Sequence, residues 1–365
     1  MIELRTSERS LYHRCPQRWV WSVKEQLAPH REQTPLWFGT LIHIALAKWY
    51  LKGIKRGPHP ADTFQEEIKE NRIIRTVDSE EAEAEFEDAK ELGIQMLANY
   101  ISHYGRDEHQ HWIATEKTGY VYLPDLAGKP RQVKYYFTFD GVYRDLNDGF
   151  IKMAEHKTAG TIVTSHLPLD QQGGSYWAVI VGKLKRAGLI NEDDHVDAIE
   201  YNFLRKAKKD MRPKNDKGQH TNKPLKDHYH VTFREAGLPE ELWGKLKMED
   251  LAKLAYREGI KVLGEVSASQ PMPLFERYPI FRTPGERRSQ LLRIREDAWH
   301  IDQARHNPSY PIVKNVVTTG PLACQHCPFF RMCQLDEQGD KESVEEFKAA
   351  MYTKRDPYAA YRKPA

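Results

Sequence analysis

The four cysteines of this chain lie near its two ends, and a ligand set that uses all of them constrains the whole fold. Cys15 lies near the start, and three more lie near the end with two and then five residues between them: Cys324, Cys327 and Cys333. Two disulfides are an alternative, but a long chain with no recognisable secretory signal favours thiolate ligands. If one centre binds all four thiolates, the fold must bring the two ends of the chain together.

The spacing of these cysteines leaves the identity of the centre open. Thiolates separated by two residues suit zinc and iron–sulfur centres equally well. Zinc ribbons usually supply two local pairs of ligands, whereas one ligand here is remote, and His13 and His326 would allow a mixed zinc site. A link that closes a loop of about 300 residues would limit the entropy of the unfolded chain by around 5 kcal/mol. We therefore expect a structural role first and redox sensing second.

The composition is that of an ordinary globular protein. Hydrophobic residues make up 40% and charged residues 29% of the 365 residues, which suits a chain with a real core. No apolar run is long enough to span a bilayer, and the charged N-terminus lacks the apolar stretch of a signal peptide. We expect a cytoplasmic protein without membrane association. A phosphate-binding loop of the form G-x-x-x-x-G-K-[ST] is missing from the sequence, which argues against a nucleotide cofactor.

The net charge of +3 is too small to imply a nucleic-acid partner. The segment from Arg205 to Lys226 is different, because it holds nine Lys and Arg residues against two Asp. It is a candidate phosphate-contacting stretch that includes Lys206, Lys208 and Lys209. From charge alone, a solvated polar loop is an equal alternative.

The order of predicted elements indicates an α/β protein. Aromatic and β-branched segments separated by turn residues predict three consecutive antiparallel strands over 111–122, 132–144 and 149–157. Further elements surround them: helices from Thr34-Pro35 to Gly53, from near Ser79 to Tyr104-Gly105, over 168–185, 238–263 and 284–305, and a strand over 196–204. Such an order predicts a central mixed sheet.

Two charged side chains lie on the core-facing side of the third predicted strand. Alternation puts Met153, Glu155 and Lys157 on one face, where buried charges are costly unless something engages them. Asp140 ends the preceding strand, and a short turn allows it to approach Glu155. Two adjacent carboxylates repel unless a cation neutralises them, and their oxygens suit Mg²⁺ or Mn²⁺. A plain salt bridge is the more common meaning of a lone E-x-K triplet.

Two further patterns accompany this set. His43 lies in an apolar helix one turn after Gly39, although a lone histidine there is usually a satisfied core residue. Gln172 and Tyr176 lie one helical turn apart on a shared face, which alone is a weak signal.

Together these residues resemble the RecB-like branch of the PD-(D/E)XK nuclease superfamily. The resemblance is strongest to iron–sulfur exonucleases related to the CRISPR-associated RecB-like nuclease, the AddB nuclease domain and stand-alone phage forms. It spans residues 10–335. The matching elements, in the family's order, are the remote Cys15, G-x-x-x-H at Gly39–His43, Asp140, E-x-K at Glu155–Lys157, Q-x-x-x-Y at Gln172–Tyr176, and the C-terminal C-x₂-C-x₅-C.

The resemblance implies a restriction-endonuclease-like core and a role for each matching residue. His43, Asp140, Glu155 and the backbone carbonyl of His156 would bind the metal ion. Lys157 would orient the attacking water and stabilise charge. Because a free lysine has a pKa near 10.4, acting as a base would require a decrease of roughly three units, so we favour metal-generated hydroxide. Gln172 and Tyr176 would contact DNA or orient the lysine, and Glu116 would have a supporting role. Apart from the resemblance, the charge of the basic segment leads us to expect that Arg205, Lys206, Lys208 and Lys209 contact phosphates.

The resemblance also implies a [4Fe-4S] cluster on the four cysteines and a metal-dependent DNA exonuclease acting on single strands or ends. The alternative is a non-catalytic iron–sulfur DNA-binding subunit with a recombination or helicase partner. The intact metal-site set counts against it. A redox enzyme is a third option, but it lacks a flavin or nicotinamide fingerprint.

We expect a single nuclease domain over residues 1–340, followed by a polar tail over 341–365. Within the domain, the expected parts are a helical region over 1–105, the nuclease core over 106–205, a basic loop and helices over 206–310, and the iron–sulfur region over 311–340.

Overall fold

The structure is a computed structural model that describes residues 1–30, 34–72, 80–320 and 323–362. Backbone contacts divide the chain into two compact units. The first comprises Met1–Lys206 and Phe275–Ala365, and the second is Ala207–Leu274. The expected single domain therefore contains an inserted unit, and the two units are described separately below.

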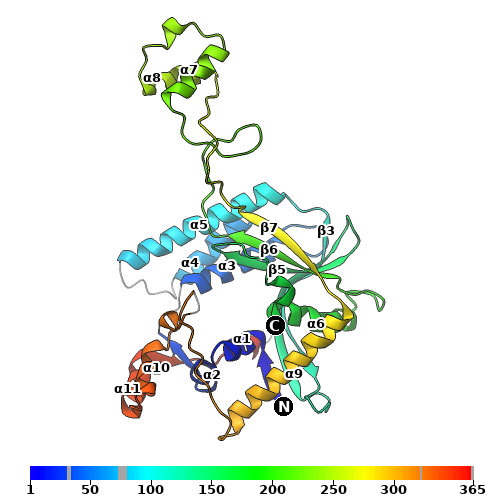
Figure 1. The fold of residues 1–365 in the computed structure, drawn as a ribbon. Coiled ribbons are helices and arrows are strands. Elements are labelled where there is room, and N and C mark those ends of the chain that lie inside the picture. The colour runs from blue at the N-terminus through cyan, green and yellow to red at the C-terminus, as the bar shows by residue number, and fades with distance from the viewer. Residues whose placement is uncertain (31–33, 73–79, 321–322, 363–365) are drawn as a thin grey trace. The chain divides into compact units, whose positions relative to one another are not determined.

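A six-stranded mixed sheet organises the first unit (Figure 1). Its strands are β1 (Ile2–Arg5), β3 (Gln110–Leu123), β4 (Val133–Asp145), β5 (Ile151–Ala159), β6 (Ala198–Arg205) and β7 (Phe275–Phe281). The pairs β1–β4 and β5–β6 are parallel, and the other neighbours are antiparallel. The predicted α/β class with a central mixed sheet is confirmed.

Strand β4 changes partners along one of its edges. The other edge pairs with β3 over almost its whole length. The changing edge pairs with β1 over Val133–Tyr136 and with β5 over Gly141–Arg144. Residues 137–140 therefore border a fork between β1 and β5, and Asp140 lies at that fork.

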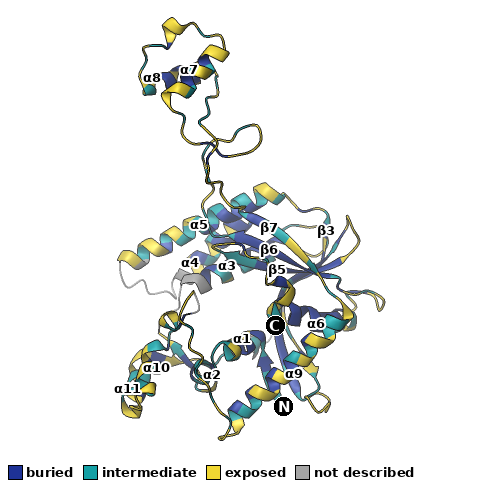
Figure 2. Ribbon diagram, in the orientation of Figure 1, coloured by how far each residue is buried: buried dark blue, intermediate teal, exposed yellow. Residues whose placement is uncertain are grey.

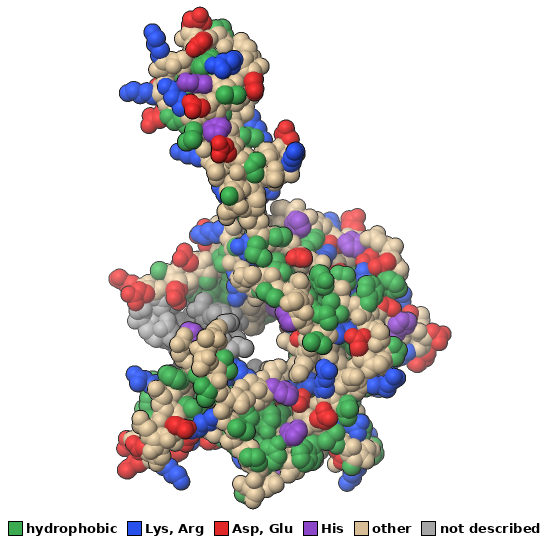
Figure 3. Space-filling model, viewed as in Figure 1, with side chains coloured by type: hydrophobic (Ala, Val, Ile, Leu, Met, Phe, Trp, Pro, Cys, Tyr) green, Lys and Arg blue, Asp and Glu red, His purple; other side chains and the backbone are tan. Residues whose placement is uncertain are grey.

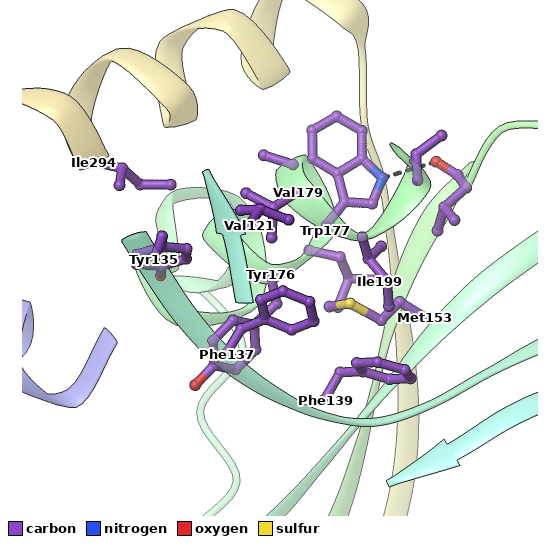
Figure 4. Packing of buried hydrophobic residues seen from close by; sticks show 14 of the residues in the cluster. Val121, Tyr135, Phe137, Phe139, Met153, Tyr176, Trp177, Val179, Ile199 and Ile294 are labelled. Atoms are coloured by element: carbon purple, nitrogen blue, oxygen red, sulfur yellow. Dashed lines mark hydrogen bonds between the residues drawn. The ribbon is translucent and has the colours of Figure 1, made fainter. Parts of the chain in front are cut away.

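The main hydrophobic core lies between the sheet and two helices, α6 (Gln171–Arg186) and α9 (Pro284–His306). Tyr135, Phe137 and Phe139 alternate along β4 and point into this core (Figure 4). Trp177 of α6 also lies in it and donates its indole N–H to the Val196 carbonyl at 2.7 Å. Burying each such side chain contributes about 1.5–3 kcal/mol. Because β4 alternates regularly over residues 133–139, Lys134, Tyr136 and Thr138 face away from α6.

Three helices of the N-terminal third lie on the other side of the sheet (Figure 1): α3 (Thr34–Trp49), α4 (Pro60–Arg72) and α5 (Glu80–Tyr104). They match two of the predicted helices and add α4. The predicted cap at Thr34 and the predicted start near Ser79 lie outside the described side chains. Figure 2 shows that the strands between the two helical layers are largely buried.

The two ends of the chain meet in the first unit. The N-terminal elements are α1 (Thr6–Arg14), α2 (Pro16–Trp19), a π-helical turn (Val20–Lys24) and β2 (Leu27–Pro29). The C-terminal ones are α10 (Phe330–Glu337), α11 (Lys341–Met351), β8 (Tyr352–Lys354) and α12 (Ala359–Arg362). Strands β2 and β8 pair antiparallel.

The segment after Asp340 is therefore more than the expected polar tail. Val344 and Tyr352 are buried in a small core with Trp21 and Phe329. Tyr358 hydrogen-bonds to Glu8, which is fully buried in α1. These apolar and hydrogen-bonded contacts explain why a mostly polar segment is ordered.

The second unit contains a small core of its own. Its helices are α7 (Lys226–Glu235) and α8 (Met248–Arg257), which enclose Phe233, Trp243 and Leu251. The helix predicted over 238–263 is thus shorter than expected. The unit begins and ends next to paired residues, since Leu204 of β6 lies opposite Phe275 of β7.

Candidate active site

Asp140 occupies the point where β4 and β5 separate. The ladder between these strands ends at Gly141 and Ala154. Beyond it, the backbone N–H of His156 donates to Asp140 Oδ2 at 2.6 Å. The other carboxylate oxygen, Oδ1, lies 2.7 Å from His43 Nδ1. The fork thus holds the carboxylate through one strand and one helix.

Gly141 allows β4 to take this path. A Cβ at this position would lie 2.1 Å from Cζ3 of Trp112, and the indole is fully buried. The strand can therefore pass Trp112 only without a side chain. This requirement fixes the backbone next to Asp140.

His43 reaches the fork from α3. Gly39, one turn earlier in α3, lies close to Thr158 near the end of β5. A Cβ on Gly39 would lie 3.5 Å from Thr158 Oγ1, which is an ordinary contact. The approach of α3 to β5 is close, but it does not require glycine.

Glu155 and Lys157 lie on the α6 side of β5, as strand alternation predicts. The Glu155 carboxylate is 3% exposed and accepts a hydrogen bond from Lys157 Nζ at 2.7 Å. The same ammonium group donates to Gln172 Oε1 at 3.3 Å. Lys157 therefore links the strand to the first turn of α6.

The start of α6 is itself fixed by Asp170. This carboxylate accepts hydrogen bonds from the backbone N–H groups of Gln172 and Gly173, a helix cap that is worth about 1 kcal/mol. It also accepts from Tyr201 Oη at 2.9 Å. A Cβ on Gly173 would lie 2.6 Å from that hydroxyl, so the glycine allows the contact.

A buried hydrogen-bond network holds His156 from the side of α5. Asn202 Nδ2 lies 2.9 Å from His156 Nδ1 and donates to Tyr100 Oη at 2.8 Å. Arg277 donates to the same hydroxyl and to both carboxylate oxygens of Asp107. These residues come from four distant segments, so no local pattern in the sequence predicts them. Asp170, in contrast, carries a recognisable signal as an Asp before Gln-Gln-Gly-Gly.

The carboxylates at the fork have opposite pKa shifts. Burial alone would raise the pKa of Asp140, but the charge and hydrogen bond of His43 lower it to about 2. Burial raises the pKa of Glu155 to about 7, and the charge of Asp140 adds to this while Lys157 opposes it. One carboxylate is therefore firmly ionised and the other is poised to hold a proton.

The two histidines at the fork also have pKa values shifted in opposite directions. Burial alone would lower the pKa of His43, but the Asp140 charge raises it to about 9. Burial lowers the pKa of His156 to about 4, so its ring is neutral. For Lys157, the charges of Glu155 and Asp170 outweigh burial and raise the pKa above its ordinary value. The ammonium group is therefore a persistent cation.

The donors at the fork suit a hard divalent ion in their chemistry. They are two carboxylates, an imidazole and the carbonyl of His156, and oxygen-rich sets of this kind bind Mg²⁺ or Mn²⁺. In the described part of the chain, however, no group of three His, Cys, Asp or Glu side chains is placed to hold a metal ion as it stands. The protonated His43 and Lys157 neutralise the carboxylates instead. A divalent ion would have to take over that role.

Of the two remaining predicted residues, Glu116 lies near the fork and Tyr176 lies in the main core. Glu116 of β3 lies near Asp140. Burial raises the pKa of Glu116, and the negative charge of Asp140 raises it further. Tyr176 is 7% exposed and packs near Phe137 in the main core. It lies one turn from Gln172, as expected, but presents little surface to a ligand.

The basic residues after β6 divide between the two units. Arg205 Nε donates to the Gly160 carbonyl at 3.2 Å, and the Lys206 ammonium group lies 5.3 Å from the centre of the Phe38 ring. Both therefore support the end of the sheet. Lys208 and Lys209 are exposed at the start of the second unit.

The four cysteines, all within the described ranges, line a single cavity, although no three of them are placed to hold a metal ion as they stand. All are free thiols, and all line one cavity of about 450 Å³ between α1, α2 and α10. Three cationic side chains line it as well: Arg14, Arg18 and Lys314. Burial raises the pKa of the Cys333 thiol. The arrangement meets the requirement that the ends of the chain join, and its chemistry fits a thiolate-bound centre.

The comparisons with known proteins identify the class. The family model of the PD-(D/E)XK nuclease superfamily matches residues 6–334. The chain therefore belongs to the PD-(D/E)XK nuclease superfamily, whose members cleave phosphodiester bonds, act on DNA and typically use Mg²⁺ or Mn²⁺. A search of curated proteins finds no match. Among the helices of the described ranges, none has both the length and the apolar composition needed to cross a bilayer.

Proposed function

We propose that this chain is a metal-dependent DNA exonuclease that acts on single strands or DNA ends. The observation that carries the proposal is the shared position of Lys157 Nζ between Glu155 and Gln172, next to the paired Asp140 and His43. A structural salt bridge would need only Glu155 and Lys157. The additional carboxylate and histidine, both partly buried at a strand fork, favour a catalytic set.

Different residues of the site would bind the metal ion and stabilise charge on the substrate. Asp140, Glu155, His43 and the His156 carbonyl would hold Mg²⁺ or Mn²⁺. When bound, such an ion neutralises phosphate charge and makes water a stronger acid. The raised pKa of Lys157 keeps it protonated, so it orients the substrate phosphate and stabilises negative charge instead of removing a proton. Gln172 holds the ammonium group in place.

A [4Fe-4S] cluster on Cys15, Cys324, Cys327 and Cys333 is the second part of the proposal. It is supported by the single cavity that all four thiols line. A cluster there would tie α1 and α2 to α10 and so join the two ends of the chain. Its role would be structural, because a cross-link of this span mainly restricts the unfolded chain.

The cluster is tested by replacing one ligand. Cys333→Ala should give colourless protein with a lower melting temperature than wild type, since it loses a cross-link worth up to about 5 kcal/mol. Absorbance near 400 nm, iron content and thermal melting of anaerobic preparations measure this. One zinc ion per chain and no iron would show that the cysteines form a zinc site instead of an iron–sulfur cluster. Brown protein of unchanged stability would reject the ligand assignment.

The activity is tested with DNA labelled at one end. Anaerobically purified protein is incubated with Mn²⁺ and with single- or double-stranded DNA labelled at the 5′ or the 3′ end. We expect short products from single strands or ends. Circular single-stranded DNA is the control, because an exonuclease leaves it intact. Cutting of circles would make the enzyme an endonuclease, and no product from any substrate would favour a non-catalytic DNA-binding subunit.

A further inference from the structure

An exposed row of side chains continues from the fork along the β3–β4 hairpin. Lys134, Tyr136 and Thr138 of β4 face away from the main core, and their partners on β3 share that face. The successive pairs are Thr118–Thr138, Tyr120–Tyr136 and Tyr122–Lys134. The row begins beside Glu116 and Asp140, so it is continuous with the candidate active site.

Two tyrosine rings in this row are accessible. Tyr120 is 42% exposed and Tyr122 is 37% exposed, and their ring centres lie 5.5 Å apart. Tyr136 is buried beneath Tyr358 and Tyr361, whose ring centres lie 5.6 and 5.3 Å from its own. Between these rings and Asp140, Thr118 and Thr138 present a polar surface and share a hydrogen bond of 2.9 Å.

Cationic groups lie over the same two rings. Lys134 Nζ lies 4.6 Å from the centre of the Tyr120 ring, and the Arg131 guanidinium lies 4.6 Å from the centre of the Tyr122 ring. Lys134 also pairs with Glu3 at 3.6 Å, which fixes its position. Exposed aromatic rings next to cations are the combination that binds single-stranded nucleic acid, because bases stack on the rings and phosphates meet the cations.

The fork and the tyrosine rings lie further apart than one nucleotide can span. Figure 3 shows that the first unit is hollowed between the part that carries α3 and the part that carries α1. Tyr136 and Asp140 are four residues apart on one strand, which corresponds to about 13 Å. This distance exceeds one nucleotide, so only an oligonucleotide can occupy both the fork and the tyrosines.

We propose that Tyr120 and Tyr122, together with Arg131 and Lys134, form a stacking platform that holds single-stranded DNA leading to or from the fork. The inference rests on the proposed nuclease function and adds the path of its substrate. A single strand fits better than a duplex, because a duplex keeps the faces of its bases covered. The positive charge and the polar threonines favour DNA over an apolar protein partner.

Binding is measured first, in a Lys157→Ala background that does not cut. Fluorescence anisotropy with a labelled single-stranded 12-mer should show that Tyr120→Ala/Tyr122→Ala binds at least about tenfold more weakly than the same background with both tyrosines. Tyr120→Phe/Tyr122→Phe should bind normally, because phenyl rings still stack. Tyr278→Ala is the matched control, since that ring is 40% exposed on β7. Equal affinity for the double alanine variant and this control would overturn the platform.

Cleavage of substrates of different length gives a second test that a folding defect cannot mimic. In otherwise wild-type protein, Tyr120→Ala/Tyr122→Ala should lower kcat/KM about tenfold on a 12-mer and leave it unchanged on a dinucleotide that cannot reach the rings. An equal loss on both substrates would reject the platform. Tyrosine-dependent binding without cleavage by wild type would reject the proposed nuclease function and retain the platform.

Discussion

At the scale of single residues, protonated side chains at the fork balance the negative charge that a metal ion would otherwise balance. His43 has a pKa raised to about 9 and pairs with Asp140, while Glu155 has a pKa raised to about 7 and pairs with Lys157. These protonated groups balance the charge of the carboxylates. A divalent ion must displace some of them, so ion binding and proton release are coupled.

This coupling predicts how pH affects stability without metal. A raised pKa means that the folded state binds the proton more tightly than the unfolded state, so the stabilisation is complete at low pH and is lost as pH rises. For His43 the loss runs from about pH 6.5 to about pH 9, and for Glu155 from about pH 4.5 to about pH 7. In EDTA, raising the pH from 6.5 to 9 should lower the melting temperature of wild type more than that of His43→Gln.

Added Mg²⁺ should reverse this trend, because it competes with the protons. The increase in melting temperature on adding Mg²⁺ should therefore be larger at pH 8.5 than at pH 6.5. Differential scanning calorimetry of wild type and Asp140→Asn measures it, with the variant as the control that lacks an essential carboxylate. A Mg²⁺ effect that is larger in acid would contradict the description of the fork.

At the scale of elements, the geometry of β4 decides where Asp140 lies. The strand passes Trp112 at Gly141, and its pairing with β5 begins at the same residue, next to Asp140. Overpacking in such a site usually costs about 1–3 kcal/mol. The position of the carboxylate therefore depends on a residue that has no side chain.

Gly141→Ala should destabilise the protein by about 1–3 kcal/mol and also reduce cleavage, because relief of the clash displaces β4. Gly160→Ala is the matched control: a Cβ there meets no atom within 4 Å, and it follows the end of β5 closely. Urea unfolding and a cleavage assay on each variant measure the two effects. Comparable stability and activity in both variants would show that the strand can shift without consequence.

A strand can be predicted from the sequence only where its own residues show a local pattern. Strands β3, β4 and β5 alternate and end at turn residues, so their positions follow from the residues themselves. Strand β1 has four residues, and β7 carries Pro279 at the edge of the sheet, so neither gives a clear pattern. Both depend on neighbours distant in the sequence.

The same distinction applies to the site. Asp140, Glu155 and Lys157 could be identified because strand alternation places charged residues on a core-facing side. The network of Asn202, Tyr100 and Arg277 could not, because its members meet only in the folded chain. Long-range hydrogen bonds leave no spacing in the sequence.

At the scale of the whole molecule, the chain consists of a closed body and an insertion. Pairing of β2 with β8 and of Tyr358 with Glu8 joins the two ends of the body. The second unit, in contrast, is inserted between strands β6 and β7, which pair with each other without it. We infer that the body does not need the insertion to fold.

Excision tests this inference. Residues 207–274 are replaced by Asn-Gly, which leaves four residues between the paired Leu204 and Phe275, a loop length that antiparallel hairpins commonly use. The shortened protein should fold cooperatively, with a melting temperature close to that of wild type, and should still cleave a dinucleotide. Circular dichroism and the cleavage assay measure this. An unfolded product would show that the insertion is part of the folding core, despite the pairing of Leu204 with Phe275.

The proposed function requires that the Lys157 ammonium group beside two carboxylates supports phosphodiester cleavage. Nucleotide release from end-labelled single-stranded DNA in Mn²⁺ measures this, with wild type compared to Lys157→Ala and to Lys341→Ala, an exposed lysine at the start of α11. We predict that Lys157→Ala lowers kcat by about 10²-fold or more with DNA affinity unchanged, and that Lys341→Ala cuts normally. Normal cleavage by Lys157→Ala would show that this ammonium group has no catalytic role.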